Sequence, residues 1–198
     1  MFSLNKILKT QFLVGVTFLF FTISVLGGGK VEKVTGEYVR APGPNGNLTP
    51  LQITEVAAHE ATESSPQKGF YFTHTDSDDD GVYDSWRLID LDDSENSCVN
   101  IYGDGVARVG GLVSEWSDGN RLAGRYLGYD LLDGGQPDTY EYVDFLTIIL
   151  FSEPDPENPA EILLGLMHWC DTGELLEGVY DGAFPKYVSE GNLKIHNR

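Results

Sequence analysis

Residues 69–90 read GFYFTHTDSDDDGVYDSWRLID, two runs rich in apolar and aromatic residues on either side of an acidic loop. A hard cation such as Ca²⁺ takes roughly six to eight oxygen ligands, and alternate side chains of a short loop can supply them. The loop has such side chains, a glycine for the sharp turn, and a residue that needs to give only its backbone carbonyl: Asp76, Asp78, Asp80 and Asp84, with Gly81 and Val82. The sequence therefore predicts a strand, a calcium-binding loop and a second strand.

The spacing of these aspartates and the glycine resembles the calcium loops of EF-hands, dockerins and thrombospondin type 3 repeats. The resemblance covers residues 76–87 and implies one Ca²⁺ bound by the four aspartates and the Val82 carbonyl. It fails at the twelfth position, where Arg87 replaces the usual bidentate carboxylate. We expect weak calcium affinity for that reason. A solvated turn rich in Asp and Gly is the alternative.

The chain repeats itself from residue 69 onward. Gly-x-Tyr triplets begin at residues 69, 124 and 178, a spacing of 55 and then 54 residues, and residue 36 begins a further copy. Residues 84–90 resemble residues 138–144, and residues 116–122 resemble residues 169–175. Matches in the same order indicate a duplicated unit.

Apolar alternation and Asp-Gly turn signals predict a mainly β domain. We expect an antiparallel β sandwich or meander barrel from two repeats of about 54 residues, followed by a C-terminal strand. The repeats would cover residues 69–123 and 124–177 of a domain spanning 69–198. Residues 29–68 are predicted to hold a strand, a turn and one short helix over 49–62, begun by Thr49 and Pro50.

Residues 158–167 allow two interpretations. Asn158 and Pro159 could begin a helix, since both residues suit a helix N-terminus. The counterpart in the first repeat, residues 111–116, is too rich in glycine to be helical. Because repeats should share elements, we expect a strand here.

The second repeat has its own version of the acidic loop at residues 130–141. It keeps carboxylates at the first, ninth and twelfth positions, but Leu132 and Gly134 stand where the third and fifth positions need oxygens. One functional loop and one degenerate loop is the simplest interpretation. An ion shared by both loops and closed by Glu141 is the alternative.

Residues 1–28 have the pattern of a secretory signal peptide. Lys6 and Lys9 precede an apolar stretch over residues 12–26, and three glycines follow it. We therefore expect a secreted or periplasmic protein that has no membrane contact after cleavage. An uncleaved membrane anchor is the alternative.

Export bears on the two cysteines, Cys98 and Cys170, because an oxidising compartment favours a disulfide between them. Two separate buried thiols are the alternative. A metal site made by Cys170 and His168 would have only two of the four ligands that zinc needs.

The charge excludes some partners. The chain has 13 Lys and Arg against 31 Asp and Glu, a net charge of −18. Such a protein repels phosphate backbones and anionic lipid surfaces, so neither nucleic acid nor an anionic membrane is an expected partner. Calcium is the expected partner, with carbohydrate as a further candidate.

No sequence motif of a catalytic site occurs, whether a nucleophile elbow, an HExxH zinc motif, a P-loop or a dinucleotide fingerprint. His74 is either an exposed residue at a strand end or a neighbour of the ion. Trp86, Trp116 and Trp169 are either core residues or stacking platforms for a sugar ring. The sequence thus predicts an exported, non-catalytic β module with a structural calcium ion. A carbohydrate or small-ligand-binding β domain and a secreted hydrolase with a carboxylate pair are the alternatives.

Overall fold

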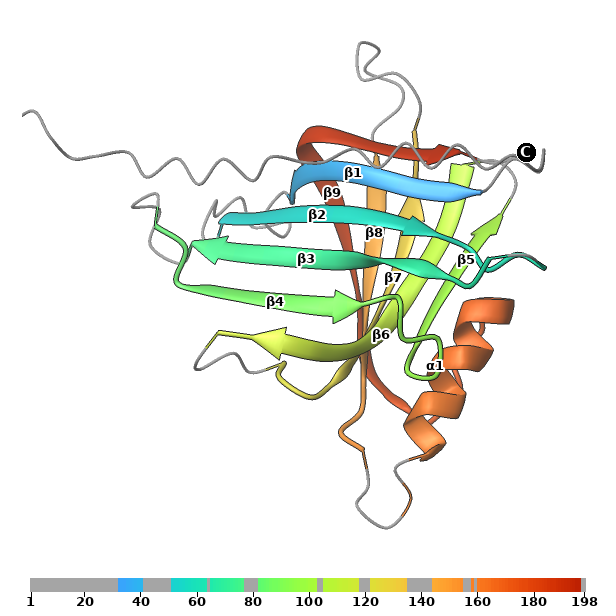
Figure 1. The fold of residues 1–198 in the computed structure, drawn as a ribbon. Coiled ribbons are helices and arrows are strands. Elements are labelled where there is room, and N and C mark those ends of the chain that lie inside the picture. The colour runs from blue at the N-terminus through green and yellow to red at the C-terminus, as the bar shows by residue number, and fades with distance from the viewer. Residues whose placement is uncertain are drawn as a thin grey trace, which may run out of the picture.

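The computed structural model describes residues 32–40, 51–63, 65–76, 82–102, 105–117, 122–134, 144–154, 158 and 160–196 of the 198-residue chain. Within these residues the fold is mainly β, as expected, with nine antiparallel strands and one helix (Figure 1). The strands are β1 Lys33–Arg40, β2 Leu51–His59, β3 Lys68–Asp76, β4 Ser85–Asp90, β5 Ser97–Tyr102, β6 Val106–Trp116, β7 Tyr126–Leu132, β8 Phe145–Phe151 and β9 Tyr180–His196. The helix, α1 Ala160–Thr172, lies between β8 and β9 in the chain. No helix of the described residues is long and apolar enough to cross a membrane.

One curled sheet contains all nine strands, in the order β4-β3-β2-β1-β9-β8-β7-β6-β5. β4 also pairs with β6, over residues 87–89, so the strand pairings run in a closed ring that leaves out only β5. β4 and β5 lie end to end along the same edge of β6. Most pairs join strands that are neighbours in the chain, as in a meander.

Two long strands make the sheet curl. β9 pairs first with β8 and then, from Val188 onward, with β1, and it changes direction between them (Figure 1). β6 pairs with β7 and β5 in its first part and with β4 in its last residues. Gly110 and Gly111 precede this change, and a Cβ at Gly111 would lie 2.7 Å from the Cβ of Ser97. Glycine is typical of such close approaches in bent strands.

The curled sheet has an apolar inner face, and α1 covers part of its outer face. The inner core contains side chains from every strand: Val34, Tyr38, Val56, Ala58, Tyr71, Ile89, Leu91, Val99, Ile101, Ala107, Val109, Val113, Leu127, Tyr129, Leu131, Leu146, Leu193 and Ile195. Outside, α1 packs on β5, β6 and β7 through a second cluster that includes Ile162, Leu166 and Trp169. The expected disulfide is confirmed, since Cys98 of β5 is bonded to Cys170 of α1.

The helix expected over residues 49–62 is wrong, because residues 51–59 form β2. Burial alternates along this strand, with Thr54, Val56 and Ala58 facing the interior. Both edges of β2 are paired, to β1 and to β3. The apolar spacing suited a helix, but pairing on two edges outweighs that local preference. Thr49 and Pro50, the expected helix start, lie outside the described residues.

The strand expected over residues 158–167 is also wrong, because α1 occupies residues 160–172. The Asn158 carbonyl accepts a bond from the Glu161 N–H at 3.2 Å, and its side-chain amide donates to the Glu161 carboxylate at 3.1 Å. Buried residues at helical spacing, Ile162, Leu166 and Trp169, then give the helix an apolar side. The comparison with residues 111–116 misled the prediction, because those residues belong to β6.

The two predicted repeats share one hairpin and differ after it. The hairpins β3–β4 and β7–β8 both flank an acidic loop. The first is followed by β5 and β6, whereas the second is followed by α1 and β9. β1 and β2, which lie within the predicted N-terminal section, belong to the same sheet as the later strands, because β1 pairs with β9 and β2 with β3.

Candidate functional site

Arg87 is the most unusual residue of the interior. It lies in β4 opposite Thr73 of β3, which is fully buried, and it is itself only 8% exposed. Its Nε has no hydrogen-bond partner, and no ion pair joins its guanidinium to another residue that the structure describes. A buried charge without a counter-charge is costly, so such a group calls for a partner.

A second unpaired polar atom lies in the same interior. The Tyr129 ring stacks on the Tyr71 ring with centroids 3.8 Å apart, and the Tyr71 hydroxyl bonds that of Tyr38 at 2.6 Å. The Tyr129 hydroxyl is buried and has no hydrogen-bond partner within the described part of the chain. Tyr71 lies opposite Ile89, one inward-facing position along β4 from Arg87. The interior therefore combines aromatic rings with two buried polar atoms, Arg87 Nε and the Tyr129 hydroxyl, that have no hydrogen-bond partner among the described residues.

The inner face is incompletely covered along β8 and β9. Ile148 of β8 packs against the inner core but is only partly buried. Opposite it stands Phe184 of β9, which is 47% exposed, and Lys186 stands opposite the buried Leu146. Residues directly opposite in an antiparallel pair point to the same face of the sheet. Phe184 and Lys186 therefore belong to the inner face, and solvent reaches that face here.

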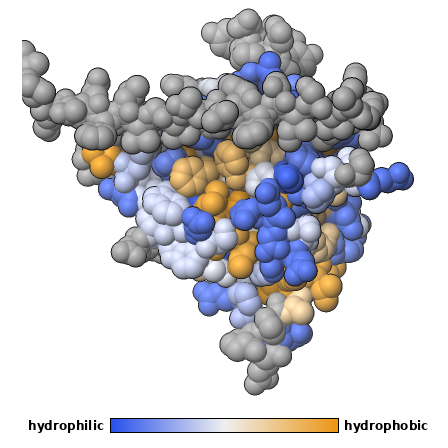
Figure 2. All heavy atoms as spheres, viewed as in Figure 1, coloured by the Kyte–Doolittle hydropathy of each residue, from blue (hydrophilic) through white to orange (hydrophobic). Residues whose placement is uncertain are grey.

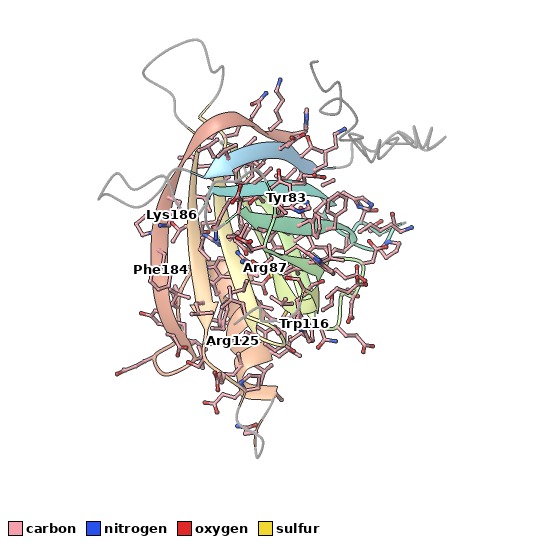
Figure 3. All side chains as sticks on the ribbon, turned by 90° about the vertical axis from the view of Figure 1, so that its left-hand side faces the viewer. Tyr83, Arg87, Trp116, Arg125, Phe184 and Lys186 are labelled. Atoms are coloured by element: carbon pink, nitrogen blue, oxygen red, sulfur yellow. A yellow bond between two sulfur atoms is a disulfide. The ribbon has the colours of Figure 1, made fainter. Side chains whose placement is uncertain are left out.

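Figure 3 shows how the surrounding side chains lie. Lys186 and Phe184 are on one side of that view and Trp116 on the other, with Arg87 between them. Trp116, at the end of β6, stands opposite Arg87 in the strand register and is 43% exposed. We call this region the inner opening, defined by Arg87, Trp116, Ile148, Phe184 and Lys186.

Arg125, just before β7, has a structural role. Its guanidinium donates to the Phe151 carbonyl and to the Asp181 carboxylate, which joins the end of β8 to the start of β9. The hydrogen bond from Arg125 lowers the pKa of Asp181, with a smaller opposing effect of burial. Arg125 therefore already has a counter-charge, unlike Arg87.

The predicted calcium loop is described only at its ends. Asp76 is the last residue of β3 and is buried, and the Asp84 N–H donates to the Thr75 carbonyl at 2.9 Å. Val82 is exposed. Asp78, Asp80 and Gly81 lie outside the described residues. Within the described part of the chain, no three His, Cys, Asp or Glu side chains are grouped so that they could hold a metal ion.

The carboxylates described near the second acidic loop bind other parts of the protein. Asp130 bonds Arg108 at 2.8 Å. Asp133 and Asp144 accept hydrogen bonds from backbone N–H groups of β9, those of Ile195 and Leu193. The remainder of that loop, with Glu141, lies outside the described residues. The described acids of this loop therefore tie β7 and β9 into the sheet.

The tryptophans and His74 have different environments. Trp169 belongs to α1 and is buried, whereas Trp116 is exposed at a strand end, so their predicted equivalence is wrong. Trp86 and His74 lie beside Phe72 on the face of β3 and β4 opposite to Arg87. Burial lowers the pKa of His74. His168 is partly buried on α1, and because Cys170 is in the disulfide these two residues form no metal pair.

Arg87 was predicted only as the residue that interrupts the calcium loop, and Phe184 and Lys186 carried no sequence signal. The sequence offered one indirect sign: Thr73 and Thr75 alternate with the aromatic residues of β3, which indicates a polar inward row. Comparison of the chain with protein-family models, with curated proteins and with solved structures gives no match.

Proposed function

We propose that this chain is an exported, non-catalytic module that binds a small molecule on the inner face of its curled sheet, at the inner opening. The observation that carries the proposal is the buried Arg87, whose Nε lacks a partner on a face that solvent reaches. Binding sites for small molecules are typically concave and apolar with a few polar groups. Phe184 and Ile148 supply apolar surface, and Arg87 and Tyr129 supply polar groups.

Export is part of the proposal. It rests on the signal-like residues 1–28, which lie outside the described residues, and on the disulfide, which is compatible with an oxidising compartment. Sequencing the N-terminus of the mature protein should find a start between residues 28 and 30. An intact N-terminus in the membrane fraction would favour an anchor instead.

The binding proposal is tested with a neutral apolar fluorophore, N-phenyl-1-naphthylamine. We expect saturable binding of one probe per chain, weakened several-fold by Phe184→Ala. The matched control is Leu164→Ala, because Leu164 is 67% exposed on α1, which packs on the outside of the sheet. Figure 2 shows hydrophobic and hydrophilic residues on the face seen in Figure 1. Equal effects of the two substitutions, or the absence of saturable binding, would contradict the proposal.

A structural calcium ion at the acidic loop is a second candidate function. The observation that favours it is the hydrogen bond from Asp84 to Thr75, which brings the two ends of the loop together. An ion that binds only the folded state stabilises it by about 2.7 kcal/mol at a hundredfold excess over Kd. Calcium should therefore raise the melting temperature, and Asp80→Ala should remove that rise. Glu177→Ala, at an exposed acid away from the loop, should keep it. A melting curve that calcium does not move would leave the loop as a turn.

A further inference from the structure

We infer that the molecule bound at the inner opening is an apolar chain or ring that carries a single carboxylate, with Arg87 as its anchor; this inference rests on the proposed function. The guanidinium is planar and presents paired N–H donors that match a carboxylate. Arg87 has this group buried, on the inner face, with no counter-charge among the described residues.

The charge distribution supports an anion at this place. The protein as a whole is strongly acidic, with a net charge of −18. Two other described arginines, Arg108 and Arg125, have carboxylate partners in Asp130 and Asp181. No carboxylate pairs with Arg87 or with Lys186 in the described part of the chain. The inner opening therefore has two cationic side chains that no described carboxylate pairs with, on a protein that is anionic as a whole.

The side chains of the inner opening fit three other classes of ligand less well: a sugar, a phosphate dianion and a neutral apolar molecule. A sugar would need several free hydrogen-bonding side chains, but the partly uncovered wall consists of Ile148, Leu150 and Phe184. The inward threonines beside Arg87, Thr73 and Thr75, are buried and already bonded to Thr54 and Gln52. A phosphate dianion would bring two charges to a site with one buried guanidinium, which would leave a charge poorly compensated. A neutral apolar molecule would leave Arg87 buried without a counter-charge. A monoanion with an apolar body satisfies both the wall and the arginine.

Two further groups fit this ligand. The Tyr129 hydroxyl is a buried donor without a partner among the described residues, so it can bond a carboxylate oxygen or a water beside it. Lys186 shares the inner face and is partly exposed, so it can attract the anion at the entrance. The two positions differ in burial, and loss of Arg87 should therefore cost more than loss of Lys186.

The test compares dodecanoate with dodecanol as competitors of the neutral fluorophore at neutral pH. Hydrogen bonds to charged groups favour the ionised head, so dodecanoate should bind roughly tenfold to a hundredfold tighter than the alcohol. Arg87→Met should bring this ratio close to one and leave the affinity for the neutral fluorophore within about twofold, since methionine keeps the apolar bulk. Arg87→Lys should retain part of the preference, because it keeps the charge but not the planar fork.

The control lies on the same strand. Lys194 of β9 is exposed and its neighbours Leu193 and Ile195 face the interior, so Lys194 points outward. Lys186→Met should lower the preference for dodecanoate, whereas Lys194→Met should not.

The outcomes separate the two proposals. Binding of the fluorophore without a preference for dodecanoate, or with a preference that survives Arg87→Met, overturns the carboxylate inference and leaves the proposed function standing. Equal or tighter binding of dodecyl phosphate also overturns it. Failure of both the fluorophore and dodecanoate to bind overturns both proposals.

Discussion

Substituting Gly128 of β7 by alanine tests how α1 is held on the sheet. Gly128 faces the ring of Trp169, and a Cβ added to Gly128 would lie 2.5 Å from Cζ3 and 2.7 Å from Cη2 of that ring. Carbon atoms in contact ordinarily stay about 3.5–4.0 Å apart, so the ring would have to move by about 1 Å. It has little room, since Trp169 is 1% exposed and meets the Phe151 ring edge-on at 6.0 Å.

The expected magnitude follows from two opposing effects. Overpacking of a filled core costs about 1–3 kcal/mol. Replacing glycine in a strand stabilises the folded protein by about 0.5–1 kcal/mol, since the unfolded chain has less freedom to lose. Gly128→Ala should therefore lower the free energy of unfolding by about 0.5–2 kcal/mol. In a Trp169→Leu background, which removes the obstructing ring, the same substitution should be neutral or stabilising.

Urea unfolding followed by far-ultraviolet circular dichroism measures this double-mutant cycle, because that signal reports mainly on the backbone and remains usable when Trp169 is replaced. The coupling energy between the two positions should be about 1–3 kcal/mol. Gly182→Ala is a matched control, since its Cβ would meet the Phe184 ring at 2.8 Å, but that ring is exposed and can move away. Equal costs of Gly128→Ala with and without Trp169 would refute the reasoning.

Three further predictions concern the remaining supports of the fold. Replacing Cys98 and Cys170 together by serine should lower the free energy of unfolding by about 4 kcal/mol in the chain-entropy model, given their separation of 72 residues; labelling of two thiols in the denatured, unreduced parent would contradict this. Gln67 donates to the Leu91 carbonyl at 2.7 Å and accepts from the Val99 N–H at 2.9 Å where β4 gives way to β5. Gln67→Leu should leave both groups unpaired and cost about 2–4 kcal/mol by urea unfolding, and a loss below about 1 kcal/mol would count against it. Burial raises the pKa of Asp130 in the folded protein, and Arg108 opposes that rise. The folded protein therefore loses stability as pH rises through the folded pKa of Asp130, and it would lose more without Arg108 to stabilise the ionised carboxylate. Arg108→Met should therefore destabilise the protein more at pH 7 than at pH 3, and Asp130→Asn in that background should remove the pH dependence; an equal cost at both pH values would contradict the ion-pair role.

The sequence by itself determined the mainly β fold and the disulfide. Apolar alternation and turn residues act over a few positions, so the strands that became β1, β3 and β4 could be predicted from local pattern. With only Cys98 and Cys170 in the chain, one intramolecular pairing was available. The calcium hypothesis for the acidic loop also rests on local spacing, within nine residues, and it stays a prediction.

Only the tertiary structure decided β2, α1 and the position of Arg87. Residues 51–59 have a helical apolar spacing, yet they lie between β1 and β3, where backbone pairing on both edges decides their conformation. Arg87 faces inward because β4 pairs with β3 in the register that sets it opposite Thr73, and β6 covers its other edge. A shift of that register by one residue would turn Arg87 outward. Pairing between strands far apart in the chain sets the register, so local sequence could not reveal a buried, unpaired arginine.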